Sequence, residues 1–178
     1  MGKSTLTNLL RDRLHADLSV SMTTRPKAAT DVEGEHYYFV DHDQFNQAIA
    51  DGQLLEYAQV YGNLYGTPRQ AVENKLADGH IVILEIDMDG AAQVKANLDD
   101  CFALFIDPPS NEALLQRLRD RKREDEATIQ KRFARAQHEI ADAHQGQVYD
   151  AFLINDDLGR AVEEALARIE VEQRCRQV

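Results

Sequence analysis

The amino-acid sequence predicts a three-layer α/β domain, in which a parallel sheet carries helices on both faces. Three almost continuous apolar runs, "HIVILEI", "CFALFI" and "AFLI", are typical of strands buried on both faces. Helical segments separate these runs, and strands that alternate with helices favour a parallel sheet. The 178 residues suit one compact domain that carries inserted lobes.

The first part of the chain predicts a helix, a short strand and a small mixed lobe. Apolar residues at helical spacing follow Lys3, and they are Leu6, Leu9, Leu10 and Leu14. The segment "LSVSMTTRP" predicts a short strand. The lobe, from about residue 23 to 78, combines one helix, "DQFNQAIADG", with short strands and loops in "HYYFVD", "LLEYAQV" and "YGNLYGTP".

The remainder of the chain returns to a rhythm of strands and helices. The buried strand in "HIVILEIDMDG" precedes a helix in "GAAQVKANL", and "CFALFIDPP" predicts a second buried strand. A charged helical section, a third strand in "AFLIND" and a closing helix from Asp157 to about Arg176 follow. We expect a single domain made of a core (1–22, 79–110 and 144–178), a lobe (about 23–78) and a lid (about 111–143).

Composition limits the partners of this chain. The net charge of −11 argues against wide contact with DNA or RNA, because phosphate binding depends on clustered Lys and Arg. No apolar run approaches the ~20 residues needed to cross a bilayer, and the N-terminus does not resemble a secretory signal. Cys101 and Cys175 lie far apart and suggest no disulfide framework, so we expect a cytoplasmic protein.

The chain begins with Gly2-Lys3-Ser4-Thr5, which matches the second half of the phosphate-binding motif G-x-x-x-x-G-K-[ST]. In that loop, backbone N–H groups wrap phosphate oxygens, the Lys contacts the terminal phosphates, and the Ser hydroxyl helps to hold Mg²⁺. Four residues alone fit a helix start with a Ser or Thr cap equally well, so the later segments must decide.

Two acids end the first core strand. Glu85 and Asp87 lie two positions apart, so on a strand their side chains point the same way. Open α/β sheets place their ligands at this end of the strands. The pair is suited to orienting a substrate hydroxyl or a Mg²⁺-bound water, and the alternative is that these acids cap the following helix.

The expected lobe contains residues suited to a nucleoside monophosphate. Arg and Tyr side chains donate hydrogen bonds to phosphate, and a carboxylate accepts from both N1–H and N2–H₂ of guanine. Adenine lacks that donor pair, so a buried Glu56 would favour guanine. Taken singly, each tyrosine is more often a packing residue than a ligand. The candidates are Ser21, Arg25, Tyr37, Glu56, Tyr65 and Thr67.

The charged helical section carries Arg117, Arg121 and Arg132. Arg117 and Arg121 are four residues apart and therefore share a helix face. One interpretation is a solvated face with salt bridges, which is common for charge runs. The other is a lid that brings guanidinium groups onto a phosphoryl group in transfer.

Taken together and in this order, the segments resemble the guanylate kinases, which transfer phosphate from ATP to GMP in purine nucleotide metabolism. The resemblance extends over nearly the whole chain, and it implies a P-loop NTPase-type sheet with a GMP-binding lobe and a helical lid. The segments that carry it are GKSTL, SVSMTTR, EGEHYYF, LLEYAQVYGNLYGTP, ILEIDMDGAAQV, FALFIDPPS, RLRDR, IQKRF and FLINDDL.

The resemblance also implies roles for individual residues. Glu56 would recognise guanine, with Thr67 as its hydroxyl partner. The remaining GMP ligands would be Ser21, Arg25, Tyr37, Tyr65, Glu85 and Asp87. Gly2, Lys3, Ser4 and Thr5 would serve the ATP phosphates, with Ser4 at Mg²⁺ and Asn155 near the adenine. The residues acting in phosphoryl transfer would be Lys3, Arg117, Arg121 and Arg132, with no covalent nucleophile from the protein.

The chain departs from the family at two places, the pattern T-T-R-x-P-R-x-G-E and the P-loop. Ala28 stands where the family has a second phosphate arginine, and the adjacent Lys27 lacks the bidentate fork of Arg. Family members also begin with a buried strand and the glycine-rich half of the P-loop, which implies about a dozen further residues. We therefore expect impaired kinase activity and reduced stability for the 178-residue chain, with a misplaced gene start as the plainest explanation and genuine loss as the alternative.

Two other functions stay open at this point. A non-catalytic guanylate-kinase-like module would bind GMP or a protein through the lobe, and the incomplete P-loop and Ala28 favour it. A kinase for another nucleoside monophosphate is disfavoured by Glu56 with Thr67. We expect small-molecule substrates, no nucleic acid and no membrane, and the sequence leaves the choice between monomer and homo-oligomer undetermined.

Overall fold

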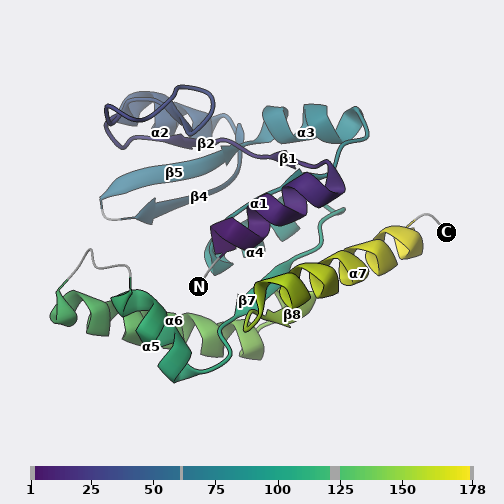
Figure 1. Ribbon diagram of the computed structural model, residues 1–178. Helices are drawn as coiled ribbons and strands as arrows, with labels where there is room; N and C mark the ends of the chain where they lie inside the picture. The colour runs from purple at the N-terminus through teal and green to yellow at the C-terminus, as the bar shows by residue number, and fades with distance from the viewer. Residues whose placement is uncertain (1–2, 61, 121–124, 177–178) are drawn as a thin grey trace. The chain divides into compact units, whose positions relative to one another are not determined.

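The computed structural model describes residues 3–60, 62–120 and 125–176. The chain divides into two compact units, which are described separately below (Figure 1). The terminal unit comprises residues 1–10 and 102–178, and the central unit comprises residues 11–101. Helix α1 (Lys3–Leu14) begins in the first and ends in the second.

A four-stranded sheet forms most of the central unit. Its strands run in the order β3-β2-β5-β4, with β2 and β3 parallel and the other pairs antiparallel. The local pattern alone predicted short strands here, but not the parallel pairing of β2 with β3. The bounds are β2 (Ser21–Thr23), β3 (Tyr37–Phe39), β4 (Leu54–Val60) and β5 (Asn63–Pro68).

Helix α2 (His42–Ala50) packs on this sheet. It begins with a capping box, in which Asp41 and Gln44 satisfy each other's backbone N–H groups. Phe45 is fully buried and packs with Leu54, which anchors the helix to β4. Gly66 allows this close approach, because a Cβ there would lie 2.9 Å from Leu54 Cδ1 and 3.1 Å from Phe45 Cζ.

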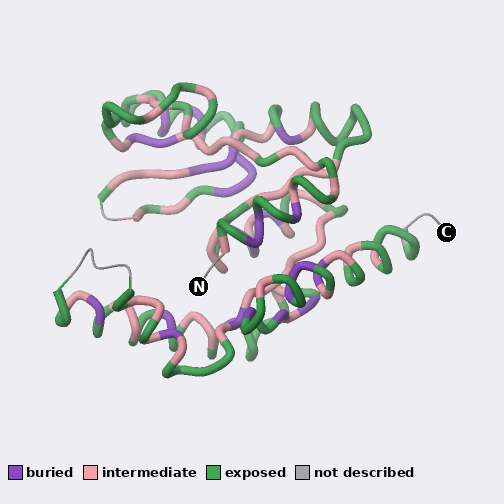
Figure 2. Tube along the Cα trace, viewed as in Figure 1, coloured by how far each residue is buried: buried purple, intermediate pink, exposed green. Residues whose placement is uncertain are grey.

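Two further helices complete the central unit. Helix α4 (Met88–Asn97) was predicted from the sequence, whereas α3 (Arg69–Ala77) was not. Leu55, Val72 and Val94 form a buried cluster that joins β4, α3 and α4. Figure 2 shows buried stretches of β4 and β5 in purple, so the interior of this unit lies where these strands meet the helices.

The core strands pair in parallel, as the sequence predicted. In the central unit β1 (Asp17–Leu18) pairs with β6 (Val82–Ile83), and in the terminal unit β7 (Leu104–Asp107) pairs with β8 (Ala151–Ile154). The apolar run "HIVILEI" predicted a longer strand than β6. Residues after Ile83 have no ladder partner in the described structure, and strand pairing ends there.

The helical section of the terminal unit consists of α5 (Asn111–Arg119) and α6 (Glu126–Gln145), with residues 121–124 outside the described structure. Ser110 and Asp125 cap their first turns, each accepting a hydrogen bond from a backbone N–H. The closing helix α7 (Leu158–Arg176) follows β8.

The terminal unit has its own buried residues. Leu114 and Leu153 are almost fully buried, and so are Ala136 and Ala143 of α6 and Ala161 and Ala165 of α7, small residues that let helices approach closely. His144 stacks on Phe152 with ring centroids 4.2 Å apart, and its Nε2 lies 2.9 Å from a carboxylate oxygen of Asp107. Among the described residues, none of the helices combines the length and apolarity required of a membrane span.

Candidate active site

Glu56 lies on β4 directly opposite Thr67 on β5, where a shift in strand register follows Leu54. Only 6% of Glu56 and 1% of Thr67 are exposed. The Thr67 hydroxyl donates a hydrogen bond of 2.6 Å to Glu56 Oε1. A bulge of this kind re-aims a side chain, and here a carboxylate faces the interior of the central unit.

The buried carboxylate of Glu56 has an unusual electrostatic environment. Burial raises the pKa of Glu56, the hydrogen bond from Thr67 opposes this rise, and the negative charge of Asp87 adds to it. A carboxylate has about four positions that can accept a hydrogen bond. Among the described residues, Thr67 donates the hydrogen bond to the Glu56 side chain. Glu56 therefore keeps acceptor capacity for donors brought by a ligand.

Asp87 performs the capping role that was one of its two interpretations. Its side chain accepts a hydrogen bond of 2.9 Å from the Gly90 N–H and so caps α4. A carboxylate at a helix N-terminus is stabilised by the helix dipole. The cap does not exclude a ligand, because the second oxygen of an Asp that caps through Oδ1 is a further acceptor.

Arg25, Tyr37 and Tyr65 lie together in the central unit, as the sequence analysis required of a phosphate site. The Arg25 guanidinium lies 5.2 Å from the centre of the Tyr37 ring, and the Tyr37 and Tyr65 rings are 5.8 Å apart. Ser21 is the register partner of Tyr37 across β2 and β3. Burial is the main cause of the raised pKa of Tyr37, and the negative charge of Glu85 contributes, so that carboxylate also acts on this group.

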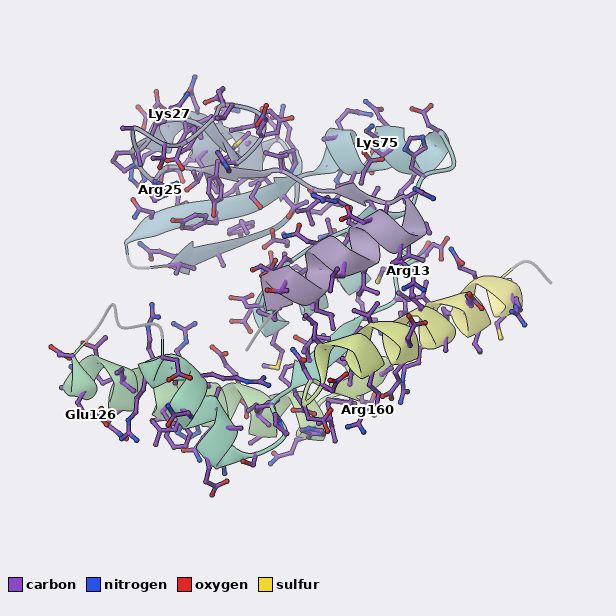
Figure 3. The ribbon with its side chains drawn as sticks, in the orientation of Figure 1. Arg13, Arg25, Lys27, Lys75, Glu126 and Arg160 are labelled. Atoms are coloured by element: carbon purple, nitrogen blue, oxygen red, sulfur yellow. The ribbon has the colours of Figure 1, made fainter. Side chains whose placement is uncertain are left out.

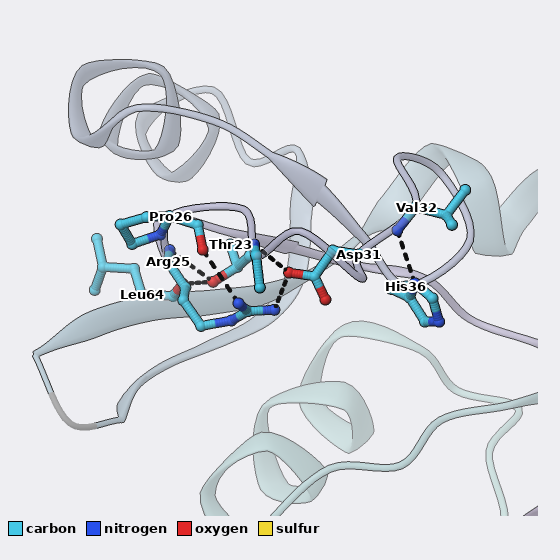
Figure 4. A network of polar contacts seen from close by, with 8 residues as sticks. Thr23, Arg25, Pro26, Asp31, Val32, His36 and Leu64 are labelled. Atoms are coloured by element: carbon cyan, nitrogen blue, oxygen red, sulfur yellow. Dashed lines mark hydrogen bonds and ion pairs between the residues drawn. The ribbon is translucent and has the colours of Figure 1, made fainter.

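Asp31 pairs with Arg25, a contact that the sequence analysis did not predict (Figure 4). Arg25 Nη2 lies 2.9 Å from Asp31 Oδ2, and this hydrogen bond is the main cause of the raised pKa of Arg25. The Ala28 N–H also donates to Asp31 Oδ2, over 2.7 Å. The signal in the sequence was weak, since Asp31 is simply the first acid after Arg25.

The loop after β2 carries two cationic side chains, Arg25 and Lys27 (Figure 3). Lys27 Nζ lies 5.7 Å from the centre of the Phe39 ring, and Arg25 lies 5.5 Å from the same ring. Lys27 is thus held on the aromatic surface that also orients Arg25. Ala28 is exposed and contributes only its backbone here.

In the terminal unit, Lys3, Ser4 and Thr5 form the first turn of α1, and Gly2 lies outside the described residues. Arg117 Nη2 on α5 donates a hydrogen bond of 2.7 Å to the backbone carbonyl of Asn155. Its Nη1 is buried and has no hydrogen-bond partner within the described structure. A buried cationic donor without an acceptor is rare in folded proteins and indicates a group suited to an incoming acceptor.

The other predicted lid arginines are less fully described. Arg132 lies on α6, and Arg121 lies outside the described residues. The described ranges contain no cluster of three or more His, Cys, Asp or Glu residues placed to hold a metal ion. Mg²⁺ in nucleotide sites needs only one or two protein oxygens besides phosphates and water, and the Ser4 hydroxyl is compatible with that requirement.

Comparisons with known proteins agree on one family. The family model described as "Guanylate kinase" matches residues 1–172. The chain is 44% identical to a guanylate kinase of Thermobifida fusca over 95% of the chain and 85% of that protein. It is also 44% identical to a guanylate kinase of Symbiobacterium thermophilum, over 97% of the chain and 81% of that protein. A crystal structure of guanylate kinase from Anaplasma phagocytophilum superposes with a TM-score of 0.76 at 31% identity, covering 96% of this chain and 81% of the other. These matches confirm the predicted family and fold class.

Proposed function

The chain belongs to the guanylate kinase family, and on that premise we propose that it transfers the γ-phosphoryl group of ATP to GMP, forming ADP and GDP. The observation that carries this proposal is the buried carboxylate of Glu56, hydrogen-bonded to Thr67 in the same unit as Arg25. We assign the GMP lobe to about 23–78, the lid to about 111–143 and the core to the rest of one domain, working in the cytoplasm.

Glu56 selects the base. Its carboxylate accepts hydrogen bonds from N1–H and N2–H₂ of guanine, while the Thr67 hydroxyl fixes its orientation through Oε1. With adenine bound, the buried carboxylate would have no such donors. An unpaired buried carboxylate costs free energy, whereas an exposed one would bind water instead. Glu85 and Asp87, which lie between the end of β6 and the start of α4, complete the substrate site.

Arg25, Tyr37, Tyr65 and Ser21 bind the phosphate of GMP. Asp31 holds the Arg25 guanidinium beside the Tyr37 ring, which orients the guanidinium in advance. The phosphate of GMP competes with Asp31 for this donor set, since both are oxygen anions. Ala28 supplies no second guanidinium, and the nearby Lys27 supplies a point charge without a bidentate fork.

The residues of the terminal unit serve ATP. Backbone N–H groups around Gly2 and Thr5 and the ammonium of Lys3 bind the phosphates, and the Asn155 segment lies near adenine. The unpartnered Nη1 of Arg117 supports its role as a donor to nucleotide oxygens, together with Arg121 and Arg132. Mg²⁺ at the Ser4 hydroxyl would supply neutralisation of the ATP phosphates.

The chemistry needs no covalent intermediate on the protein. A phosphate oxygen of GMP attacks the γ-phosphorus, the bond from that phosphorus to the bridging oxygen breaks, and ADP leaves. The protein aligns the two nucleotides and stabilises the charge on the transferring group. Exclusion of water by the lid arginines keeps ATP from being hydrolysed instead.

A coupled assay of ADP release tests the proposed function. ADP should be released with GMP and not with AMP, and the activity should disappear in Arg117→Ala. GMP binding without any ADP release would instead support a non-catalytic GMP-binding module, which Ala28 favours. Equal rates with GMP and AMP would refute guanine recognition.

A further inference from the structure

Strand β4 lies at the edge of its four-stranded sheet and pairs with β5 on one side only. On its other side the side chain of Gln93, from α4, takes the place of a neighbouring strand. The Tyr57 N–H donates to Gln93 Oε1 over 3.1 Å, and Gln93 Nε2 donates to the Tyr57 carbonyl over 3.0 Å. One side-chain amide therefore satisfies both backbone groups of a single residue.

A second amide from α4 acts two residues earlier on the same strand. Asn97 Nδ2 donates to the carbonyl oxygen of Leu55 over 2.9 Å. Tyr57 and Leu55 are the two neighbours of Glu56, so α4 holds the backbone on both sides of this residue. With β5 bonded along the opposite edge, the backbone at Glu56 is held from both directions.

The same helix controls the space around the carboxylate. A Cβ at Gly90 would lie 3.0 Å from Glu56 Oε2 and 3.3 Å from Asp87 Oδ1. Gly90, Gln93 and Asn97 are three and four positions apart, so they share one face of α4. On that face, Gly90 leaves room for the Glu56 carboxylate, and Gln93 and Asn97 bind the backbone of β4.

We propose that Gln93 is a positioning residue for Glu56, and that Gln93, Asn97 and Gly90 together set the selectivity of the chain for guanine. The inference depends on the proposed function, in which Glu56 recognises the base. The hydrogen bonds of Gln93 and Asn97 determine the height and direction of the carboxylate relative to the strand. Both guanine donors, N1–H and N2–H₂, can bind the carboxylate at once only if its plane is held in one orientation. If the carboxylate shifts, we expect the hydrogen bond from N2–H₂ to weaken more than the one from N1–H.

The test compares binding of GMP with binding of IMP, whose base lacks the 2-amino group. Gln93→Met removes both hydrogen bonds and keeps an unbranched side chain of similar length. Gln70→Met is the matched control, because Gln70 is an exposed residue of α3 in the same unit, and its amide donates to Asn74 Oδ1 over 2.8 Å, away from Glu56. Isothermal titration gives the dissociation constants, and thermal unfolding reports folding of each variant.

The preference for GMP over IMP should fall about tenfold in Gln93→Met, the size of one lost hydrogen bond, and stay unchanged in Gln70→Met. GMP affinity should account for the fall, with IMP affinity little changed. Gly90→Ala should lower the same ratio. Equal loss of affinity for both nucleotides, or an unchanged ratio in folded Gln93→Met, would overturn the proposal.

If Gln93→Met does not fold, Asn97→Ala is the variant to test. It loses one hydrogen bond and should lower the preference for GMP over IMP by a smaller factor. An unchanged ratio in folded Asn97→Ala would then overturn the proposal. Failure of the underlying function has a separate signature. If the unmodified chain itself binds GMP and IMP equally, Glu56 does not recognise the 2-amino group, whatever Gln93 does.

Discussion

Replacing Glu56 by Gln removes a buried charge while preserving shape. The Gln side chain retains a carbonyl oxygen that accepts the hydrogen bond from Thr67, which is 2.6 Å long in the native chain. It also presents an NH₂ group where the carboxylate presented its second acceptor. One guanine donor would then face another donor, so the variant isolates base recognition from packing.

The magnitude follows from the hydrogen bonds at stake. Hydrogen bonds to a charged group contribute about 1.5–3 kcal/mol each, and Glu56→Gln weakens one such bond and loses the other. A total of about 3 kcal/mol corresponds to a loss of roughly 150-fold in affinity for GMP. Titration with GMP and AMP measures this directly, because AMP affinity should change little. A loss of GMP affinity below threefold would refute the role of the carboxylate.

The same substitution has an opposite effect on stability. Burial raises the pKa of Glu56, so between the ordinary glutamate pKa and the raised value the folded chain binds more protons than the unfolded chain. Stability therefore falls as pH rises through that window. Glu56→Gln should raise Tm at pH 8, and the difference should shrink towards pH 4. A lower Tm for the variant at pH 8 would contradict this assignment.

Three other substitutions test separate parts of the account. Ala28→Arg should lower KM for GMP by adding a phosphate ligand, and an unchanged KM would show that Ala28 does not weaken GMP binding. Gly66→Ala should destabilise the chain by about 1–3 kcal/mol in urea unfolding, because the new Cβ would lie 2.9 Å from the backbone oxygen of Glu56. An unchanged free energy of unfolding would mean that the strands separate easily. His144→Ala should lower the free energy of unfolding by about 1–3 kcal/mol, because the stacking on Phe152 and the hydrogen bond with Asp107 are lost. An unaltered unfolding midpoint would show that neither contact stabilises the terminal unit.

Local sequence patterns predicted several elements closely. The apolar runs that contain β7 and β8 form parallel strands, as predicted, but burial on both faces was wrong, because β7 is only partly buried and Ile154 of β8 is 55% exposed. Helix α2 begins one residue before the predicted "DQFNQAIADG" segment, where Asp41 and Gln44 form a capping box. In these cases the residues that decide the structure are neighbours in the sequence.

Other features depend on partners far along the chain. The run that contains β6 is equally apolar, yet its pairing stops at Ile83 because a strand needs a hydrogen-bonded neighbour as well as an apolar pattern. Helix α3 buries only Val72 among its nine residues, so it shows no clear buried face in the sequence. The contact of Gln93 with Tyr57 joins residues 36 positions apart, and no local pattern predicts it.

The candidate site shows the same division. The resemblance selected Glu56 with Thr67, and Arg25 with Tyr37 and Tyr65, and within the central unit the residues of each group lie together. Their roles with GMP stay predictions that the substitutions above examine. Asp31 was missed because its contact with Arg25 depends on how the loop after β2 folds back, which the composition of the loop does not specify.

The most direct measurement of the central claim is a crystal structure of the chain with GMP. We predict that both Glu56 carboxylate oxygens take part, one still bonded to Thr67, with guanine N1 and N2 within ~3.2 Å of the carboxylate. The Arg25 guanidinium should contact the GMP phosphate. Guanine bound away from Glu56, with this carboxylate still bonded to Thr67 alone, would contradict the account.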